Sequence, residues 1–152
     1  MLNKLFLCTI FLLTSCQDSL ESKYESAVAL RESKQYRESN MLLNQILNSS
    51  ESPNELKIKA NFLLAQTHLD LEYFLKSIEI YKDILSAPID NIIRKKSLFM
   101  IGYIYNNNLD MYTESKKYYN IFKTDYPSDD LIPSVDYELE QIDGLIKSIK
   151  ED

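Results

Sequence analysis

The chain has 152 residues, 45% apolar and 26% charged, with 17 basic and 23 acidic side chains and a net charge of −6. This length suits one domain, and the composition is that of a globular protein and argues against disorder. A net-acidic chain without a basic run is a poor partner for nucleic acid, whose phosphates require positive surface. Because only two glycines and four prolines interrupt it, we expect an all-α fold.

Residues 1–15 have the pattern of a signal peptide. Lys4 is the only charged residue before Cys16, and an apolar run follows it from Leu5 to Leu13. A membrane-spanning helix needs about 20 apolar residues, so this run is too short to cross a bilayer but fits the core of a cleavable leader. We therefore predict that the exported chain starts at Cys16.

The leader ends in Leu13-Thr14-Ser15-Cys16, which resembles the lipobox of bacterial lipoproteins. The resemblance implies that Cys16 carries a covalent lipid and that residues 16–17 form the anchored segment. An ordinary leader with a chance cysteine is the alternative. In enterobacteria, Asp directly after the lipidated cysteine retains a protein in the inner membrane. Here Gln17 follows it, so we expect the periplasmic face of the outer membrane.

The rest of the chain contains three similar segments at offsets of 37 or 38 residues. Each has an aromatic residue, a serine and two large apolar residues: Tyr36, Ser39, Leu43 and Ile46; Phe74, Ser77, Tyr81 and Ile84; Tyr112, Ser115, Tyr119 and Phe122. An aromatic and a small residue precede each set: Tyr24 and Ala27, Phe62 and Ala65, Phe99 and Gly102. Such a period indicates repeated units, each expected to be a helix, a turn and a second helix.

Helix start and stop signals separate these elements. Two segments have the pattern of capping boxes: Asp18-x-x-Glu21 and Ser52-x-x-Glu55. Three further residues suit a helix start, the first of them as the first helical residue: Pro53, Asp90 and Asp110. Two prolines are expected just beyond helix ends: Pro88 and Pro127. Glycine inside a helix costs about 1 kcal/mol relative to alanine, so Gly102 indicates a tight helix crossing.

A last amphipathic helix is predicted from Ser134 to about Ile149. Its apolar residues fall on one face: Val135, Leu139, Ile142, Leu145, Ile146 and Ile149. Charged residues such as Glu138 and Lys147 fall on the other. An open stack of repeats needs a terminal element with a polar outer face, and we expect this helix to supply it.

The repeat positions resemble the tetratricopeptide repeat. That family has a small residue midway along its first helix, then an aromatic, a small and a large apolar residue along its second. The match runs from Ser22 to Pro127, with serine at the usual alanine of each second helix. The resemblance implies a short right-handed solenoid of three tetratricopeptide-like helical hairpins plus a C-terminal capping helix, all within residues 18–152.

No catalytic site is expected. His68, the single histidine, lies where the repeat pattern places a packing aromatic, and we expect it to be structural. The acidic pair Asp129-Asp130, like Glu138 and Glu140, lacks the alternating oxygen ligands of a calcium loop. Phosphate loops, dinucleotide fingerprints, zinc-ligand spacings and nucleophile elbows are absent from the sequence. We predict a protein that is not an enzyme and has no cofactor besides the lipid on Cys16.

In tetratricopeptide proteins the first helices line a concave face, and residues three or four apart share one stripe of a helix. The predicted binding stripe consists of Tyr24, Val28, Arg31, Lys59, Phe62, Gln66, Lys96, Phe99, Tyr103 and Asn106. Three aromatics at one repeat position, flanked by Lys59 and Lys96, are suited to gripping an extended or helical peptide. The alternative is that Tyr24, Phe62 and Phe99 pack between hairpins as core.

Lipobox and repeats together resemble tetratricopeptide lipoproteins of the Gram-negative envelope. The similarity is to the lipoprotein subunit of the outer-membrane β-barrel assembly machine and to the repeat domain of the periplasmic cell-division coordinator. It implies a membrane-anchored adaptor or scaffold that holds a protein or peptide in envelope assembly. A pilotin-like chaperone for a secretion or pilus subunit is the alternative, and the oligomeric state is left open.

Overall fold

The computed structural model describes residues 19–88 and 91–151, which form seven α-helices without any strand. The helices are α1 (Leu20–Glu32), α2 (Tyr36–Asn48), α3 (Asn54–Asp70), α4 (Phe74–Ser86), α5 (Asn91–Asn107), α6 (Tyr112–Asp125) and α7 (Ile132–Glu151). The predicted all-α class is therefore confirmed for the part of the chain that is described.

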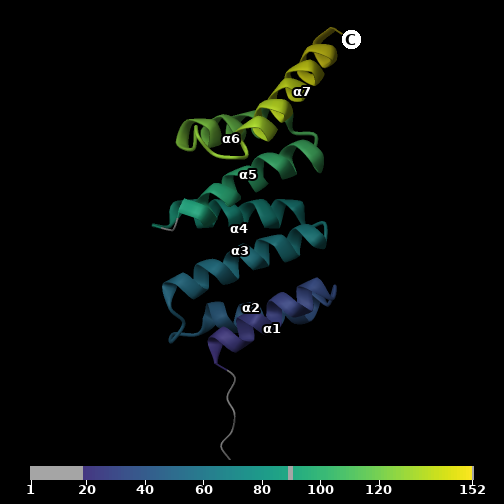
Figure 1. The fold of residues 1–152 in the computed structure, drawn as a ribbon. Coiled ribbons are helices and arrows are strands. Elements are labelled where there is room, and N and C mark those ends of the chain that lie inside the picture. The colour runs from purple at the N-terminus through teal and green to yellow at the C-terminus, as the bar shows by residue number, and fades with distance from the viewer. Residues whose placement is uncertain (1–18, 89–90, 152) are drawn as a thin grey trace, which may run out of the picture.

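The helices are stacked in chain order (Figure 1). Each packs mainly on the helix before it and the helix after it, and α1, α3 and α5 also meet in succession. The turns that join α1 to α2, α3 to α4 and α5 to α6 lie along one edge of the stack. Helix α7 leaves the stack, and its C-terminal end projects beyond the other helices (Figure 1).

A buried serine links the two helices of each pair. Its hydroxyl donates a hydrogen bond of 2.8 Å to a main-chain carbonyl on the preceding helix: Ser39 to Ala27, Ser77 to Ala65, and Ser115 to Gly102. The three serines are fully buried. The acceptor residues are small, which lets the two backbones approach closely. The small residues and serines that recur in the sequence therefore meet in space at the crossing of each pair.

Large apolar residues of the second helices fill the space beside these crossings. Tyr81, Tyr119 and Phe122 are among the largest fully buried side chains, and Leu43 and Ile46 are their counterparts in the first pair. Full burial of a side chain of this size contributes about 1.5–3 kcal/mol. The core is therefore continuous along the stack, and each helix pair contributes large buried side chains to it.

The turn inside each pair contains one residue with left-handed backbone. These residues are evenly spaced along the sequence: Lys34 (φ 62°), Glu72 (φ 62°) and Asp110 (φ 52°). In the first two turns the next N–H donates back to a helix carbonyl at 2.8 Å: Gln35 to Leu30, and Tyr73 to His68. This is the hydrogen bond of a Schellman motif, which usually has glycine at the left-handed position. None of these three turns has glycine at the left-handed position.

The capping box predicted at Asp18 is wrong. The N-cap of α1 is Ser19, whose Oγ accepts a hydrogen bond from the N–H of Ser22 at 3.1 Å. The helix thus begins one residue later than the box requires, and Asp18 itself lies outside the described residues. Serine and aspartate cap helices about equally well, so adjacent candidates compete.

The capping box predicted at Ser52 is also wrong. Ser52 is buried, its Oγ has no hydrogen-bond partner, and Pro53 occupies the N-cap position instead of the first helical position. Asp110 does not cap α6, because its backbone is left-handed and Met111 takes the cap position without a side-chain hydrogen bond. Asp90 lies outside the described residues.

The helix ends agree better with prediction. Pro88 and Pro127 each follow directly after a helix C-cap, as expected. Helix α7 begins at Ile132, two residues before its predicted start, and contains Pro133 in its first turn. A proline is accommodated there because the first turn has no intrahelical partner for its missing N–H. The predicted last helix therefore exists and is slightly longer than expected.

Candidate partner-binding surface

The predicted binding stripe lies on α1, α3 and α5, which meet in succession along the stack. Its residues are three or four positions apart on each helix, so they share one helical face. Lys59, Lys96 and Tyr103 are exposed, and all the others are partly buried. The stripe is therefore a surface whose base rests on the core.

The aromatic members of the stripe have one side on the core. Phe62 makes an edge-on contact with buried Tyr81 at 5.5 Å between ring centroids. Phe99 lies 5.8 Å from Tyr119 and 6.2 Å from Phe122. Such ring pairs add about 0.5–1.5 kcal/mol to simple burial. Phe62 and Phe99 therefore pack against the core on one side and remain partly accessible to solvent on the other.

Tyr24, the aromatic residue of the first pair, is also partly buried. Burial raises the pKa of its hydroxyl, and the nearby positive charge of Lys59 opposes this increase. Lys59 in turn donates to Glu55 at 2.6 Å within α3. Tyr24 of the first pair thus lies near Lys59 of the second pair, and Lys59 is itself paired with Glu55.

Arg31 and Asp70 connect the first two pairs at the other end of the stripe. The Nε of Arg31 on α1 donates to Oδ2 of Asp70 on α3 at 2.7 Å, and both side chains are about one quarter exposed. An ion pair at this depth contributes about 1 kcal/mol or less after its desolvation. It fixes two neighbouring helices and leaves Arg31 less available to a partner than the sequence suggested.

The third pair contains the most accessible part of the stripe. Tyr103 is 39% exposed, and Lys96 is exposed with no ion pair to any described residue. Asn106 donates to Oε2 of Glu138 at 2.6 Å, so α7 reaches the end of the stripe. Lys96 and Tyr103 can therefore offer a cation, a hydroxyl and an aromatic face to a partner.

Two buried tyrosines below the stripe were not among the predicted site residues. Tyr81 and Tyr119 are fully buried, and neither hydroxyl has a hydrogen-bond partner among the described residues. Burial raises the pKa of both hydroxyls well above the ordinary value. Their recurrence at one repeat position was a sequence signal, but it indicated packing and did not reveal the unsatisfied hydroxyls.

Asp70 and Glu138 were also missed, although they hold Arg31 and Asn106. Their charge in a helix gave no indication that they face the stripe. The stripe thus combines apolar ring contacts with polar contacts to Asp70 and Glu138. Within 19–88 and 91–151 no group of three or more His, Cys, Asp and Glu side chains converges as metal ligands would.

The proposed lipidation site, Cys16, and the predicted signal peptide lie outside the described residues. Among the helices that are described, none is both long and apolar enough to cross a bilayer. Comparison with protein-family models gives no match to this sequence, and comparison with curated proteins also gives none.

Proposed function

We propose that this protein is a membrane-anchored scaffold of the bacterial cell envelope that holds a protein or peptide partner. Its fold is proposed to be a short right-handed solenoid of three tetratricopeptide-like hairpins, with α7 as the capping helix. The observation that supports this best is the recurrence of one local structure. In each pair, a buried serine bonds to the carbonyl of a small residue, and a left-handed residue forms the turn.

Repeated helix pairs of this kind present an extended surface, and partner binding is its common use. The half-buried rings of Phe62 and Phe99 offer apolar area at low entropic cost, because the core already holds them. Lys96 and Tyr103 supply polar contacts beside them. The proposed partner is therefore a polypeptide with apolar side chains and a carboxylate or main-chain carbonyl near Lys96.

The proposed anchor is a lipid on Cys16, and the proposed location is the periplasmic face of the outer membrane. This part rests on the lipobox pattern at residues 13–16 and on Gln17. Only Gln17 and Asp18 separate Cys16 from the α1 N-cap at Ser19, so the first helix pair would sit close to the membrane. Partners already at that surface, such as outer-membrane proteins under assembly, suit this geometry.

The test places a photo-crosslinking amino acid at Lys96 or at Tyr103 in the full-length chain inside cells. The proposal expects capture of one or a few defined proteins. Lys76, which is exposed on α4 outside the stripe, is the matched control and should capture none of them. Equal capture from Lys76 and Lys96 would show that the stripe has no special role.

A second variant measures how much the stripe contributes. Tyr103→Ala should reduce capture from Lys96 about tenfold, the effect of losing about 1.4 kcal/mol of contact. Because Tyr103 is only 39% exposed, the variant should also lower Tm, so capture is compared well below the Tm of both proteins. Tyr137→Ala, at a residue 61% exposed on α7, is the control and should leave capture unchanged.

A further inference from the structure

Helices α6 and α7 run antiparallel in a defined register. The Lys123 ammonium binds the Asp136 carboxylate, and the Lys116 ammonium binds the Asp143 carboxylate. From Lys123 back to Lys116 is seven residues on α6, and from Asp136 forward to Asp143 is seven residues on α7, so the two helices keep the same register between the two ion pairs. Continued by one more turn, this register brings the first residues of α6 level with Ile146 and Ile149.

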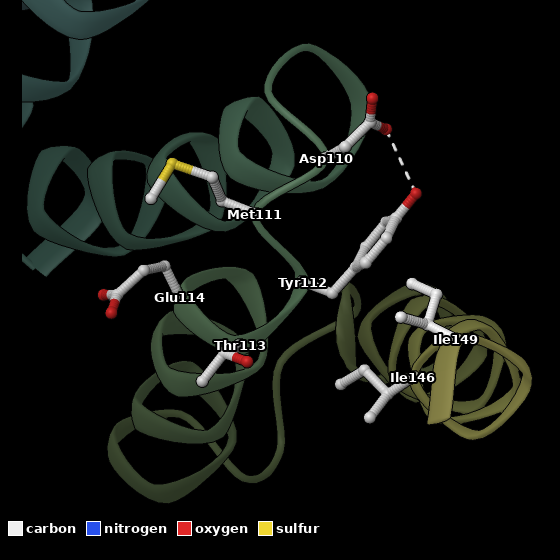
Figure 2. A pocket seen from close by; sticks show the side chains of 7 residues that line it. All are labelled: Asp110, Met111, Tyr112, Thr113, Glu114, Ile146 and Ile149. Atoms are coloured by element: carbon white, nitrogen blue, oxygen red, sulfur yellow. Dashed lines mark hydrogen bonds between the residues drawn. The ribbon is translucent and has the colours of Figure 1, made fainter. Parts of the chain in front are cut away.

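At that level the two helices do not close on each other. A cleft of about 470 Å³ lies between them, lined by residues 110–114 of the α6 start and by Ile146 and Ile149 of α7 (Figure 2). The ring of Tyr112 stands on the side facing the two isoleucines, and its hydroxyl donates to Asp110 at 3.1 Å. This hydrogen bond holds the ring in place as one wall of the cleft.

The apolar face of α7 changes from covered to uncovered along its length. Val135 and Ile142 are fully buried, whereas Leu145 is 42% and Ile149 is 61% exposed. The spacing of three and four residues continues unchanged from Val135 through Ile149, so the open part is the same face. An apolar trough between two helices is a shape that a third helix fills, with anchors every three or four residues.

The charges around the cleft indicate what kind of helix fits. Asp110 and Glu114 lie in its lining, and none of the other lining residues whose side chains the structure describes is charged. Asp110 is bonded to the Tyr112 hydroxyl, and Glu114 forms no ion pair with any described residue. A second copy of this chain, with net charge −6, would bring further negative charge to an acidic rim. A cationic occupant would find complementary charge there.

We propose that this cleft binds a cationic amphipathic helix of a partner protein. Its apolar side chains contact Ile146, Ile149 and the Tyr112 ring. Its lysine or arginine side chains pair with Asp110 next to that ring and with Glu114, whose carboxylate lies on the other side of the α6 start (Figure 2). The cleft shares no residue with the binding stripe. A negative result for either of the two proposals would therefore leave the other unaffected.

The test uses the full-length chain and a synthetic peptide of about four helical turns. The peptide has leucine at the three-and-four spacing, lysine elsewhere and one tryptophan as the reporter. Because the protein contains no tryptophan, indole fluorescence reports the peptide alone. We expect saturable binding, and we expect it to be at least tenfold weaker for a peptide in which glutamate replaces lysine.

Matched variants locate the binding site. Ile149→Ser should weaken binding of the lysine peptide about tenfold, whereas Tyr137→Ser, at an equally exposed residue of α7 outside the cleft, should leave it unchanged. Glu114→Gln on α6 should weaken binding several-fold. Glu140→Gln, at an exposed residue of α7 outside the cleft, should leave binding unchanged. Both isoleucine and tyrosine variants should keep the wild-type Tm, because the replaced side chains are mainly in solvent.

Three results would overturn the proposal. The first is lysine-peptide affinity that Ile149→Ser leaves unchanged. The second is equal affinity for the glutamate peptide, which would remove the charge argument. The third is a dimer in sedimentation equilibrium that Ile149→Ser dissociates, which would make a second copy of the chain the occupant.

Discussion

The ring of Tyr119 occupies the space that a side chain at Gly102 would need. A Cβ added at Gly102 would stand 2.8 Å from Cδ1 and Cε1 of this ring. Because Tyr119 is fully buried, the surrounding core restricts any movement of its ring away from position 102. We expect Gly102→Ala to lower the free energy of unfolding by about 1–3 kcal/mol, as overpacking does, although alanine is the better helix former. Urea denaturation measures the change.

Gly144 provides the matched comparison within α7. It is exposed, and a Cβ there would meet nothing within 4 Å. Gly144→Ala should therefore raise the free energy of unfolding by up to about 1 kcal/mol, the helix-propensity gain alone. If both alanine variants were more stable than the wild type, close packing against Tyr119 would not be the reason for glycine at 102.

The buried hydroxyl of Ser77 can be tested by two substitutions. Its hydrogen bond to the Ala65 carbonyl is 2.8 Å long, and that carbonyl also accepts a main-chain hydrogen bond inside α3. Ser77→Ala should cost about 0.5–1.5 kcal/mol, the usual net value of one hydrogen bond. Ser77→Val should cost more, because a branched side chain would push the two backbones apart. Equal costs would mean that the crossing is not tightly packed.

The left-handed turn residues suggest a stabilising change. Lys34 and Glu72 have φ of 62°, a conformation that costs a side-chain-bearing residue roughly 1–2 kcal/mol and costs glycine little. Lys34→Gly and Glu72→Gly should each raise Tm, less than the full strain because glycine also makes the unfolded chain more flexible. Lys34→Ala retains the strain and is the control. Thermal unfolding followed by circular dichroism would contradict this if the glycine and alanine variants behaved alike.

His68 should make stability depend on pH. Burial, helped by the positive charge of Lys76, lowers the pKa of His68 below 6.5, and its Nδ1 is buried without a hydrogen-bond partner. The unfolded chain therefore binds a proton at a pH where the folded protein does not. Stability from this residue is fully present above about pH 6.5, the unfolded value, and is lost as pH falls from there through the lowered pKa of the folded protein.

The variant His68→Leu tests this dependence, since Leu30 holds the equivalent position in the first pair. Between about pH 7.5 and about pH 5.5, on the two sides of the ordinary imidazole pKa, Tm should fall more for the wild type than for the variant. Parallel curves for the two proteins would show that His68 titrates alike in both states.

The proposed lipid anchor makes its own prediction. Cys16→Ser removes the thiol that would carry the lipid, and no described helix could replace it as a membrane span. We expect the variant to leave the membrane fraction and appear in the soluble periplasm. Membrane association that survives both this change and a high-salt wash would contradict the lipobox prediction.

The sequence predicted helix number and order well because the relevant signals are periodic and redundant. A small residue and a serine recur at fixed offsets, and every copy of the serine bonds to the carbonyl of the small residue before it. Helix caps were predicted poorly. Ser19 caps α1 in place of its neighbour Asp18, and Pro53 stands at the cap of α3 in place of its neighbour Ser52, whose side chain is buried.

The residues of the predicted stripe share one face of each helix, as their spacing indicated, but their degree of burial could not be predicted from the sequence. Helical spacing places Phe62 and Phe99 on one face, yet their partial burial depends on Tyr81 and Tyr119 of the next helix. Arg31 appears available in the sequence because Asp70 is 39 positions away. The turns without glycine were not foreseen, since lysine and glutamate carry no preference for left-handed backbone.

Packing between chain neighbours also governs how this molecule reaches its native state. Because each helix rests mainly on those directly before and after it, most contacts close only short loops. Chains with such local contacts fold within microseconds to milliseconds, far faster than sheets of the same size. A helix pair can find its native partner as soon as the next pair is present. Folding can therefore advance from α1 toward α7 without waiting for the C-terminal end.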